Sequence, residues 1–316
     1  MKSTISSIFI LALGGIICAL MPAASGTPQS EIAGRWDLTI GTGASTYPSW
    51  LEVTQKDGRL AGRFVGKVGS ARPVKQMEFA NSQLDFSLPP QYENFKGSIT
   101  FTATLAGDEI KGTTRGEDGT LPFVGVRAPA LPRNPAPNWG KPINLFNGKT
   151  MSGWKLKNPK LPDGWKIVNG VMENHMPSSD IVSEQQFMDF KLHLEFNVAA
   201  KSNSGVYLRG RYEVQIQDDY GKPAESHFIG GLYGFIDPVV NAAKKAQEWQ
   251  SYDVTLLGRW VTVVLNGRTV IDNKEIPGIT GGALHSREGE PGPLMLQGDH
   301  GDVFFRKLVL TPVEKE

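Results

Sequence analysis

Residues 203–221 have the sequence NSGVYLRGRYEVQIQDDYG, in which polar and apolar side chains alternate. One set is polar or bulky: Tyr207, Arg209, Arg211, Glu213, Gln215 and Gln217. The alternate set is mostly apolar: Val206, Leu208, Tyr212, Val214 and Ile216. A period of two is typical of a β-strand that packs one face on a core and leaves the other for solvent or ligand. Two arginines, a glutamate and two glutamines in succession favour a ligand. Gly210 indicates a hairpin turn, where a change of phase would separate Arg209 from Glu213.

Segments of the same character continue on both sides of this stretch, from residue 143 to the end of the chain. Only residues 239–248 have a pattern that would suit a short helix. The number and spacing of the segments predict a two-sheet jelly-roll sandwich over residues 143–316. In this fold one sheet packs on the core and an inner sheet presents its other face to ligand.

The region 27–127 contains up to eight alternating segments, with short connectors at 56–58, 80–82 and 106–108. This arrangement predicts a small antiparallel β-barrel or sandwich, with Trp36 and Trp50 in its core. We find no constellation of catalytic residues there, and expect an accessory or dimerisation role, such as covering a sugar site or binding a glycan. Residues 128–142 contain five prolines and predict a stiff, poorly packed linker.

The composition excludes some classes of function. The 316 residues carry 33 basic and 32 acidic side chains, so no basic field exists to attract nucleic acid or an anionic membrane. Residues 1–26 have a lysine at position 2, an apolar run and small residues before Gly26, which predicts a cleaved signal peptide and a periplasmic or secreted protein without a membrane association after cleavage. A retained anchor is the alternative. The single cysteine, Cys18, lies in this segment, so disulfides are not expected.

Several motifs carry a family resemblance: INLFNGKTMSGWK, DGWKIVNGVMEN, FMDFKLHLEFNV, NSGVYLRGRYEVQIQDD, EWQSYDVTLLG, VVLNGRTVID and PGPLMLQGDHGDVFFRKLVL. In this order the sequence from 141 to 312 resembles the 3-keto-disaccharide hydrolase family. The resemblance implies a concanavalin-like jelly roll in secreted or periplasmic bacterial proteins. It also implies activity on 3-keto-glycosides, either by elimination across C1 and C2 of the sugar or by hydration of the resulting 2-hydroxy-glucal.

Such an elimination needs particular groups. A ketone at C3 acidifies the hydrogen on C2, so a base is required near C2, a cation or metal at the C3 oxygen, and an acid for the leaving oxygen. If the odd-numbered residues share one sheet face, Glu213 is the candidate base, Arg209 the candidate stabiliser of the enediolate, and Gln215 a ligand for sugar hydroxyls. A structural carboxylate and guanidinium pair on a solvated face is the alternative.

A second cluster lies in LQGDHGDVFFR, where Gln297, Asp299, His300 and Asp302 follow one another closely. A histidine has a suitable pKa for proton transfer, and with an aspartate it can bind a divalent metal ion. We therefore expect His300 to be catalytic and Gln297 to bind substrate, and Asp299 and His300 are candidate metal ligands. A solvated loop histidine is the alternative. No metal is required by the sequence, and no other cofactor is expected.

The long glycine-rich segment that begins at Asp218 is typical of a functional loop. Within or after it, Asp218, Tyr233 and Trp249 are candidate substrate-binding residues, the two aromatic ones by stacking; core packing is the alternative for these. Because no dinucleotide fingerprint is present, the ketone is expected to come from a separate oxidoreductase. The competing functions are a non-catalytic glycan-binding module, which needs only aromatic and amide groups, and a conventional glycoside hydrolase.

Overall fold

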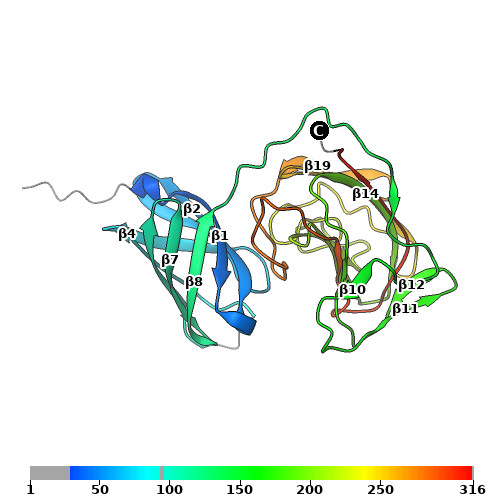
Figure 1. The fold of residues 1–316 in the computed structure, drawn as a ribbon, viewed down its shortest axis with the longest axis horizontal. Coiled ribbons are helices and arrows are strands. Elements are labelled where there is room, and N and C mark those ends of the chain that lie inside the picture. Colours follow the sequence, from blue (N-terminus) through cyan, green and yellow to red (C-terminus); the bar gives the residue numbers. More distant parts are fainter. Residues whose placement is uncertain (1–28, 93–95, 315–316) are drawn as a thin grey trace, which may run out of the picture.

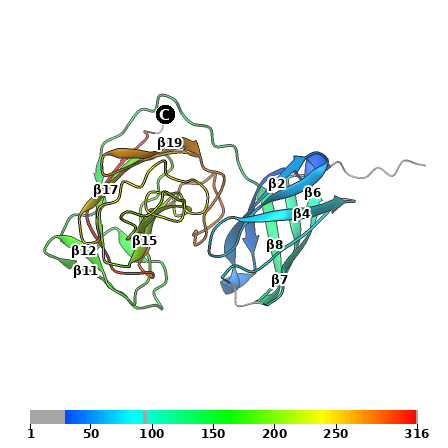
Figure 2. The same cartoon turned by 180° about the vertical axis from the view of Figure 1, so that it is seen from behind.

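The computed structural model describes residues 29–92 and 96–314. The predicted signal peptide lies outside these residues. The chain forms two lobes built of β-strands that lie side by side (Figure 1), and the view from behind shows the same arrangement (Figure 2). Within the described residues, helix is confined to two short 3-10 turns, η1 (Gln29–Glu31) and η2 (Gly43–Ser45). None of these described helices has the length and apolar character needed to cross a membrane. The predicted all-β fold class is confirmed.

The N-terminal lobe is a closed barrel of eight antiparallel strands, each paired with the next and the last with the first. The strands are β1 (Gly34–Ile40), β2 (Tyr47–Lys56), β3 (Arg59–Val65), β4 (Arg72–Ala80), β5 (Gln83–Leu88), β6 (Ile99–Ala106), β7 (Glu109–Gly116) and β8 (Gly119–Arg127). Alternation decides which side chains enter the barrel: along β6 the residues Ile99, Phe101 and Ala103 are buried and the threonines between them are exposed. The Phe86 and Phe101 rings stack in the interior, with centroids 4.5 Å apart.

The C-terminal lobe is a sandwich of two sheets, as predicted for a jelly roll. One sheet has the order β10 (Trp154–Leu156), β13 (Ile181–Ser183), β20 (Met295–Leu296), β15 (Asn203–Leu208) and β16 (Tyr212–Gln217). The other has the order β11 (Trp165–Val168), β12 (Val171–Asn174), β21 (Val303–Pro312), β14 (Phe190–Val198), β17 (Gln250–Leu257), β18 (Trp260–Leu265) and β19 (Arg268–Glu275), with β9 (Ile143–Asn144) paired to β21. Apolar side chains from both sheets form one core between them.

The short helix expected at residues 239–248 is absent, and the segment has irregular backbone. Side chains there bind the backbone amides that a helix would use. The amide of Ala243 donates to Asn241 Oδ1, and the amide of Lys244 donates to Gln250 Oε1, each at 2.9 Å. Asparagine side chains compete with helical hydrogen bonds in this way, so the apparent helical pattern was overridden.

The two lobes are joined by a hydrophobic contact centred on Trp50. Trp36 lies in the barrel core, as predicted, but Trp50 packs instead into the core of the sandwich, together with Val65. Its ring meets Phe235 edge to face at 5.4 Å and lies against Gly278, where a β-carbon would come within 2.2 Å of the indole. The prediction of Trp50 as a barrel-core residue was therefore wrong, because the strand turns this buried side chain outward to the other lobe.

The β3–β4 loop, residues 66–71, extends from the barrel onto the sandwich. The amide of Gly282 donates to the carbonyl of Lys67 at 3.0 Å. Gly281 lies so close to the loop that a β-carbon there would be 2.2 Å from the carbonyl oxygen of Gly69. The loop is thus fixed to the sandwich by its backbone, and it forms part of the candidate site described below.

The proline-rich segment between the lobes is extended and arches over the molecule (Figure 1). It is held at both ends rather than free. Near its start the backbone amide of Arg259 donates to the carbonyl of Leu131 at 3.1 Å, and near its end Trp139 forms a β-bridge with Val313. The expectation of a poorly packed linker therefore needs correction at these two points.

A buried ionic cluster also lies between the lobes. Arg259 Nη1 is 2.7 Å from both carboxylate oxygens of Glu288, and the Arg259 and Glu288 side chains are 4% and 0% exposed. Tyr212 donates to the same carboxylate at 2.9 Å. Asp37 of the barrel lies beside Glu288, whose amide points to the Asp37 carboxyl at 3.5 Å. Burial, followed by the charge of Glu288, raises the pKa of Asp37 to about 9.

The Asp37 carboxyl predicts a pH dependence of stability. Between the unfolded pKa of 3.8 and the folded value near 9, the folded chain keeps a proton that the unfolded chain releases. The free energy of unfolding therefore falls as pH rises through this window, by up to about 1.4 kcal/mol per pH unit from this group. Urea unfolding at pH 5, 7 and 9 is expected to show a flatter dependence for Asp37→Asn. The exposed turn variant Asp57→Asn should keep the wild-type slope; equal slopes for wild type and Asp37→Asn would contradict the prediction.

Candidate active site

The hairpin formed by β15 and β16 builds the floor of the candidate site. Its register pairs Tyr207 with Glu213 and Gly205 with Gln215. Odd-numbered residues of both strands therefore share one face, as the sequence predicts. Because Leu208 pairs with Tyr212, the turn between the strands has three residues, Arg209, Gly210 and Arg211, and the first two have positive φ (53° and 65°).

Glu213 is a buried carboxyl group, 4% exposed, on this face. The Tyr207 hydroxyl donates to Glu213 Oε2 at 2.9 Å. Gly205 leaves the space for this side chain, because a β-carbon there would be 2.3 Å from Glu213 Oε1. Burial raises the pKa of Glu213 to about 8, although the Tyr207 hydrogen bond and the charge of His300 act in the opposite direction. A carboxyl group with this pKa is suited to act as a general base near neutral pH.

Asp299 and His300 follow the end of β20 and face the same cavity. His300 Nδ1 and Asp299 Oδ1 are 2.5 Å apart. This hydrogen bond raises the pKa of His300. Burial alone would raise the pKa of Asp299, but the hydrogen bond and the charge of His300 lower it overall. The pair therefore favours an imidazolium beside a carboxylate, which is a proton donor that can serve at neutral pH.

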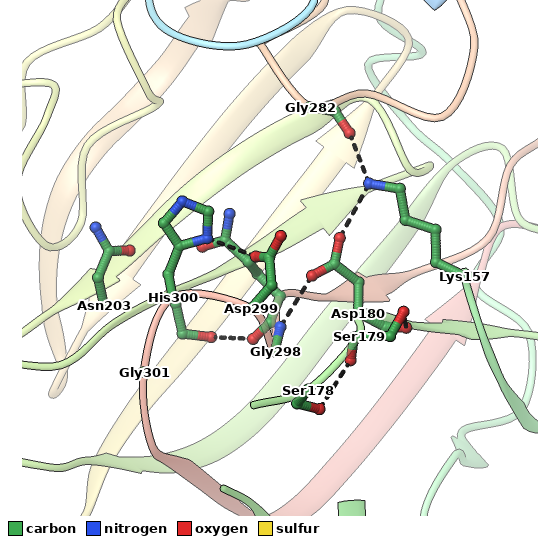
Figure 3. A network of polar contacts seen from close by, with 12 residues as sticks. Lys157, Ser178, Ser179, Asp180, Asn203, Gly282, Gly298, Asp299, His300 and Gly301 are labelled. Carbon is green, nitrogen blue, oxygen red and sulfur yellow. Dashed lines mark hydrogen bonds and ion pairs between the residues drawn. The ribbon is translucent and has the colours of Figure 1, made fainter. Parts of the chain in front are cut away.

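Lys157 and Asp180 supply a second charged pair that the sequence analysis did not identify. Lys157 Nζ lies 2.9 Å from Asp180 Oδ2 and 3.4 Å from the carbonyl oxygen of Gly282. Asp180 is held in turn by the amide of Gly298, at 3.0 Å. Figure 3 shows this chain of contacts next to the Asp299–His300 pair. Lys157 directly follows β10 and Asp180 directly precedes β13, so the pair brings a cation to the cavity from segments far from Glu213 in the sequence.

These groups line one cavity of about 180 Å³, here called the site cavity. Its walls come from the sandwich and, at one side, from the β3–β4 loop of the barrel. The lining residues are Val68, Gly69, Lys157, Asp180, Asn203, Tyr207, Glu213, Gln215, Tyr233, Gly281, Gly282, Gln297, Asp299 and His300. Of the predicted site residues, the structure brings together Glu213, His300, Gln215, Tyr233, Gln297 and Asp299.

Two amides in the site cavity have an unused acceptor. Gln215 and Gln297 are 1% and 9% exposed, and the side-chain carbonyl oxygen of each has no hydrogen-bond partner among the described residues. Buried polar atoms are nearly always paired, so these two oxygens are placed to accept hydrogen bonds from a bound ligand rich in hydroxyl groups.

Tyr233 lies at the rim of the site cavity. Burial, followed by the neighbouring hydroxyl of Tyr92, raises the pKa of Tyr233, so this phenol stays neutral.

Arg209 does not belong to the site, contrary to the prediction. Its guanidinium is fully buried, donates to the carbonyl of Gly258 at 2.5 Å and contacts the sulfur of Met188 at 3.3 Å. The ring of Tyr212 lies 5.1 Å from the guanidinium carbon. The hairpin turn changes the direction of the side chain, so Arg209 supports the turn while Lys157 provides a cation in the cavity.

Trp249 and Asp218 also lie away from the cavity, so their predicted roles in substrate binding need correction. The Trp249 ring is covered by the guanidinium of Arg306, whose central carbon is 4.3 Å from the ring centroid. The Asp218 carboxylate accepts a hydrogen bond from the amide of Lys201 at 3.0 Å. Both residues stabilise the surface of the sandwich.

The described residues contain no group of three or more His, Cys, Asp or Glu side chains placed to hold a metal ion. The two predicted ligands, Asp299 and His300, are hydrogen-bonded to each other.

A jelly-roll sandwich with a small cavity of carboxyl, amide and cationic groups is the kind of site that can bind a ligand rich in hydroxyl groups. The chain belongs to the family described as the 3-keto-alpha-glucoside-1,2-lyase-like domain, whose model matches residues 141–311. This confirms the resemblance found in the sequence, and it assigns the C-terminal lobe to a family of carbohydrate-active enzymes.

Solved structures similar to the chain include a predicted glycosyl hydrolase of Parabacteroides distasonis, with 27% identity, a TM-score of 0.47, and coverage of 57% of this chain and 92% of that one. A carbohydrate-binding module, CBM66 of Bacillus subtilis, has 14% identity, a TM-score of 0.33, and coverage of 49% and 93%. No curated protein matches the chain. The family match, rather than these likenesses, carries the assignment.

Proposed function

We propose that the protein breaks the glycosidic bond of 3-keto-glucosides by elimination across C1 and C2, and hydrates the resulting 2-hydroxy-glucal. The observation that carries the proposal is the buried Glu213 in one cavity with the cations of Lys157 and His300. A module that only binds glycans has no need of a buried base with a raised pKa. The family to which the chain belongs, named for a 3-keto-glucoside lyase, supports the same chemistry.

In the first step, the Glu213 carboxylate removes the proton from C2. The electron pair of the C2–H bond moves toward the C3 carbonyl and gives an enediolate, whose negative oxygen is stabilised by the Lys157 ammonium group. The tight Lys157–Asp180 contact holds this ammonium in position. A preorganised cation at the point where negative charge develops lowers the free energy of the transition state, because no solvent has to reorganise during the reaction.

In the second step, the enediolate re-forms the C3 ketone and expels the C1 oxygen. Electrons return to form the C1–C2 double bond, the C1–O bond breaks, and the His300 imidazolium protonates the departing oxygen. Hydration is this sequence in reverse with water in place of the alcohol: neutral His300 takes a proton from water as it adds to C1, and protonated Glu213 returns a proton to C2. The net result is hydrolysis of the keto-glycoside.

The substrate must therefore arrive with its C3 hydroxyl already oxidised. We propose that a separate oxidoreductase supplies the ketone, and that both reactions take place in the periplasm or outside the cell, after removal of residues 1–26. The Gln215 and Gln297 oxygens would accept hydrogen bonds from the remaining sugar hydroxyls.

The proposal is tested by incubating the protein with methyl 3-keto-α-glucoside in heavy water, with and without a chelator. We expect deuterium at C2 and release of methanol, and no reaction with the unoxidised glucoside. Loss of activity with chelator would add a metal to the scheme. Binding without exchange or release would identify a glycan-binding module, and cleavage of unoxidised disaccharides would identify a conventional glycoside hydrolase; either result would contradict the proposal.

A further inference from the structure

The barrel has a cavity of its own, of about 280 Å³, at the end where the β3–β4 loop emerges. It is here called the barrel cavity. Residues that line it include Tyr47, Phe64, Lys67, Val68, Phe101 and Leu121. The family match begins at residue 141, so it does not cover this lobe. The barrel cavity therefore has no role in the function proposed so far.

The barrel cavity has aromatic walls and charged ones: the charged side chains are Lys67, Arg72, Glu117 and Asp118, and the aromatic part is suited to a flat ring. Phe64 and Phe101 are nearly fully buried, and their ring centroids are 4.7 Å apart. Two cations lie over aromatic faces at its edge: Lys67 Nζ is 5.8 Å from the Tyr47 centroid, and the Arg72 guanidinium carbon is 5.7 Å from the Phe64 centroid. Aromatic walls favour an aromatic ligand by edge and face contacts, and the cations favour an electron-rich ring.

The barrel cavity and the site cavity are adjacent. Val68 lines both of them, so the two spaces share part of a wall. The neighbouring backbone is fixed, because the Lys67 carbonyl accepts a hydrogen bond from Gly282, which itself lines the site cavity. The relative position of the two cavities is thus set by the contact between the lobes.

The volumes indicate how a glycoside would divide between them. Cavities that enclose drug-sized ligands usually measure roughly 300–1,000 Å³. At about 180 Å³ the site cavity is below this range and suits one sugar ring, whereas the site cavity and the barrel cavity together reach it. The group attached to C1 is therefore expected to extend out of the site cavity, and the barrel cavity is the neighbouring space that can receive it.

We propose that the barrel cavity is the subsite for the aglycone, the group that leaves from C1, and that it favours an aromatic aglycone. This inference rests on the proposed function of the site cavity. It gives the barrel a role in specificity: the sandwich carries the chemistry on the keto-sugar, and the barrel selects what is attached to it.

The test compares phenyl and methyl 3-keto-α-glucosides in variants of the full chain. Leu121→Trp fills the barrel cavity without touching the site cavity, and we expect it to lower the phenyl-to-methyl ratio of kcat/KM about tenfold relative to wild type. Comparing variants rather than substrates removes the effect of phenol being the better leaving group. Lys67→Trp, at an exposed position that lines the barrel cavity and not the site cavity, reports the same ratio if Leu121→Trp does not fold. Val126→Trp, on the outer barrel face where the side chain is 48% exposed, is the control and should keep the wild-type ratio.

A binding measurement separates this proposal from the proposed function. Calorimetry with the Glu213→Gln variant reports affinity for both keto-glucosides without turnover. Tighter binding of the phenyl compound, lost on adding Leu121→Trp, would support the aglycone subsite even if no glycoside were cleaved. Equal affinities for the two compounds, or an unchanged ratio of kcat/KM in both tryptophan variants, would overturn the inference and leave the elimination chemistry intact.

Discussion

Replacement of Glu213 by Gln is expected to lower kcat on a 3-keto-glucoside by about 10³-fold, within the range that a general base contributes. The amide has nearly the same shape and still accepts the hydrogen bond from Tyr207, so the fold and the affinity for substrate should be retained. Deuterium exchange at C2 is the direct measurement, because it reports proton removal even when the C1 bond stays intact. The variant should lose exchange and release together.

The matched control is Glu225→Gln, which makes the same change at an exposed position in the loop after β16. It should behave as wild type. Exchange in Glu213→Gln at more than about a tenth of the wild-type rate would show that another group removes the proton, because a base of this kind contributes at least about 10²-fold.

The raised pKa of Glu213 also predicts the pH profile of the wild-type enzyme. A base must be ionised to act, and with a pKa of about 8 the carboxyl group is mostly protonated at pH 6. Because the reaction also needs His300 as an acid, we expect kcat/KM to rise about tenfold per pH unit at acidic pH and to fall again at alkaline pH, where His300 loses its proton. The hydrogen bond to Asp299 raises the pKa of His300, which keeps the acid protonated further into this range. A profile that is flat from pH 5 to 8 would contradict the assignment of Glu213.

Replacement of Arg259 by Met is expected to lower the free energy of unfolding by about 3–5 kcal/mol, the usual effect of removing one partner of a buried ion pair. The Arg259–Glu288 pair has almost no exposure to solvent, and Glu288 would be left without its cation beside Asp37. Arg259 Nη2 also donates to the carbonyl of Pro129 at 3.0 Å, so the variant loses a contact with the interlobe segment as well. Urea unfolding at pH 7 measures the change.

Two further variants show whether the charge imbalance is the cause. The double variant Arg259→Met, Glu288→Met removes both charges and should be more stable than Arg259→Met alone, because no unpaired carboxylate remains buried. Arg287→Met breaks the exposed Arg287–Glu290 pair in the same loop and should leave stability unchanged. If Arg259→Met were as stable as wild type, the ionic cluster would not hold the lobes together.

The amino-acid sequence by itself determined the all-β class and much of one wall of the site. Strict alternation in the hairpin places Tyr207, Glu213 and Gln215 on one face, because successive side chains of a strand point to opposite sides. Turn residues with positive φ, such as Gly210, fix where the strands reverse. These are local effects, and they are visible in a few adjacent residues.

Only the tertiary structure decided which other groups meet that wall. Lys157 and Asp180 lie about thirty to sixty residues from Glu213 and join it through strand order in the sheet, where β13 and β15 both pair with β20. Val68 reaches the site from another lobe, through contacts made by Trp50 and Gly281. Conversely, Arg209 is four residues from Glu213, yet the turn directs it into a buried pocket of its own. Long-range pairing and packing leave no local pattern in the sequence. The spacing of residues along the chain therefore identified the candidate base, Glu213, but predicted the wrong cation, Arg209.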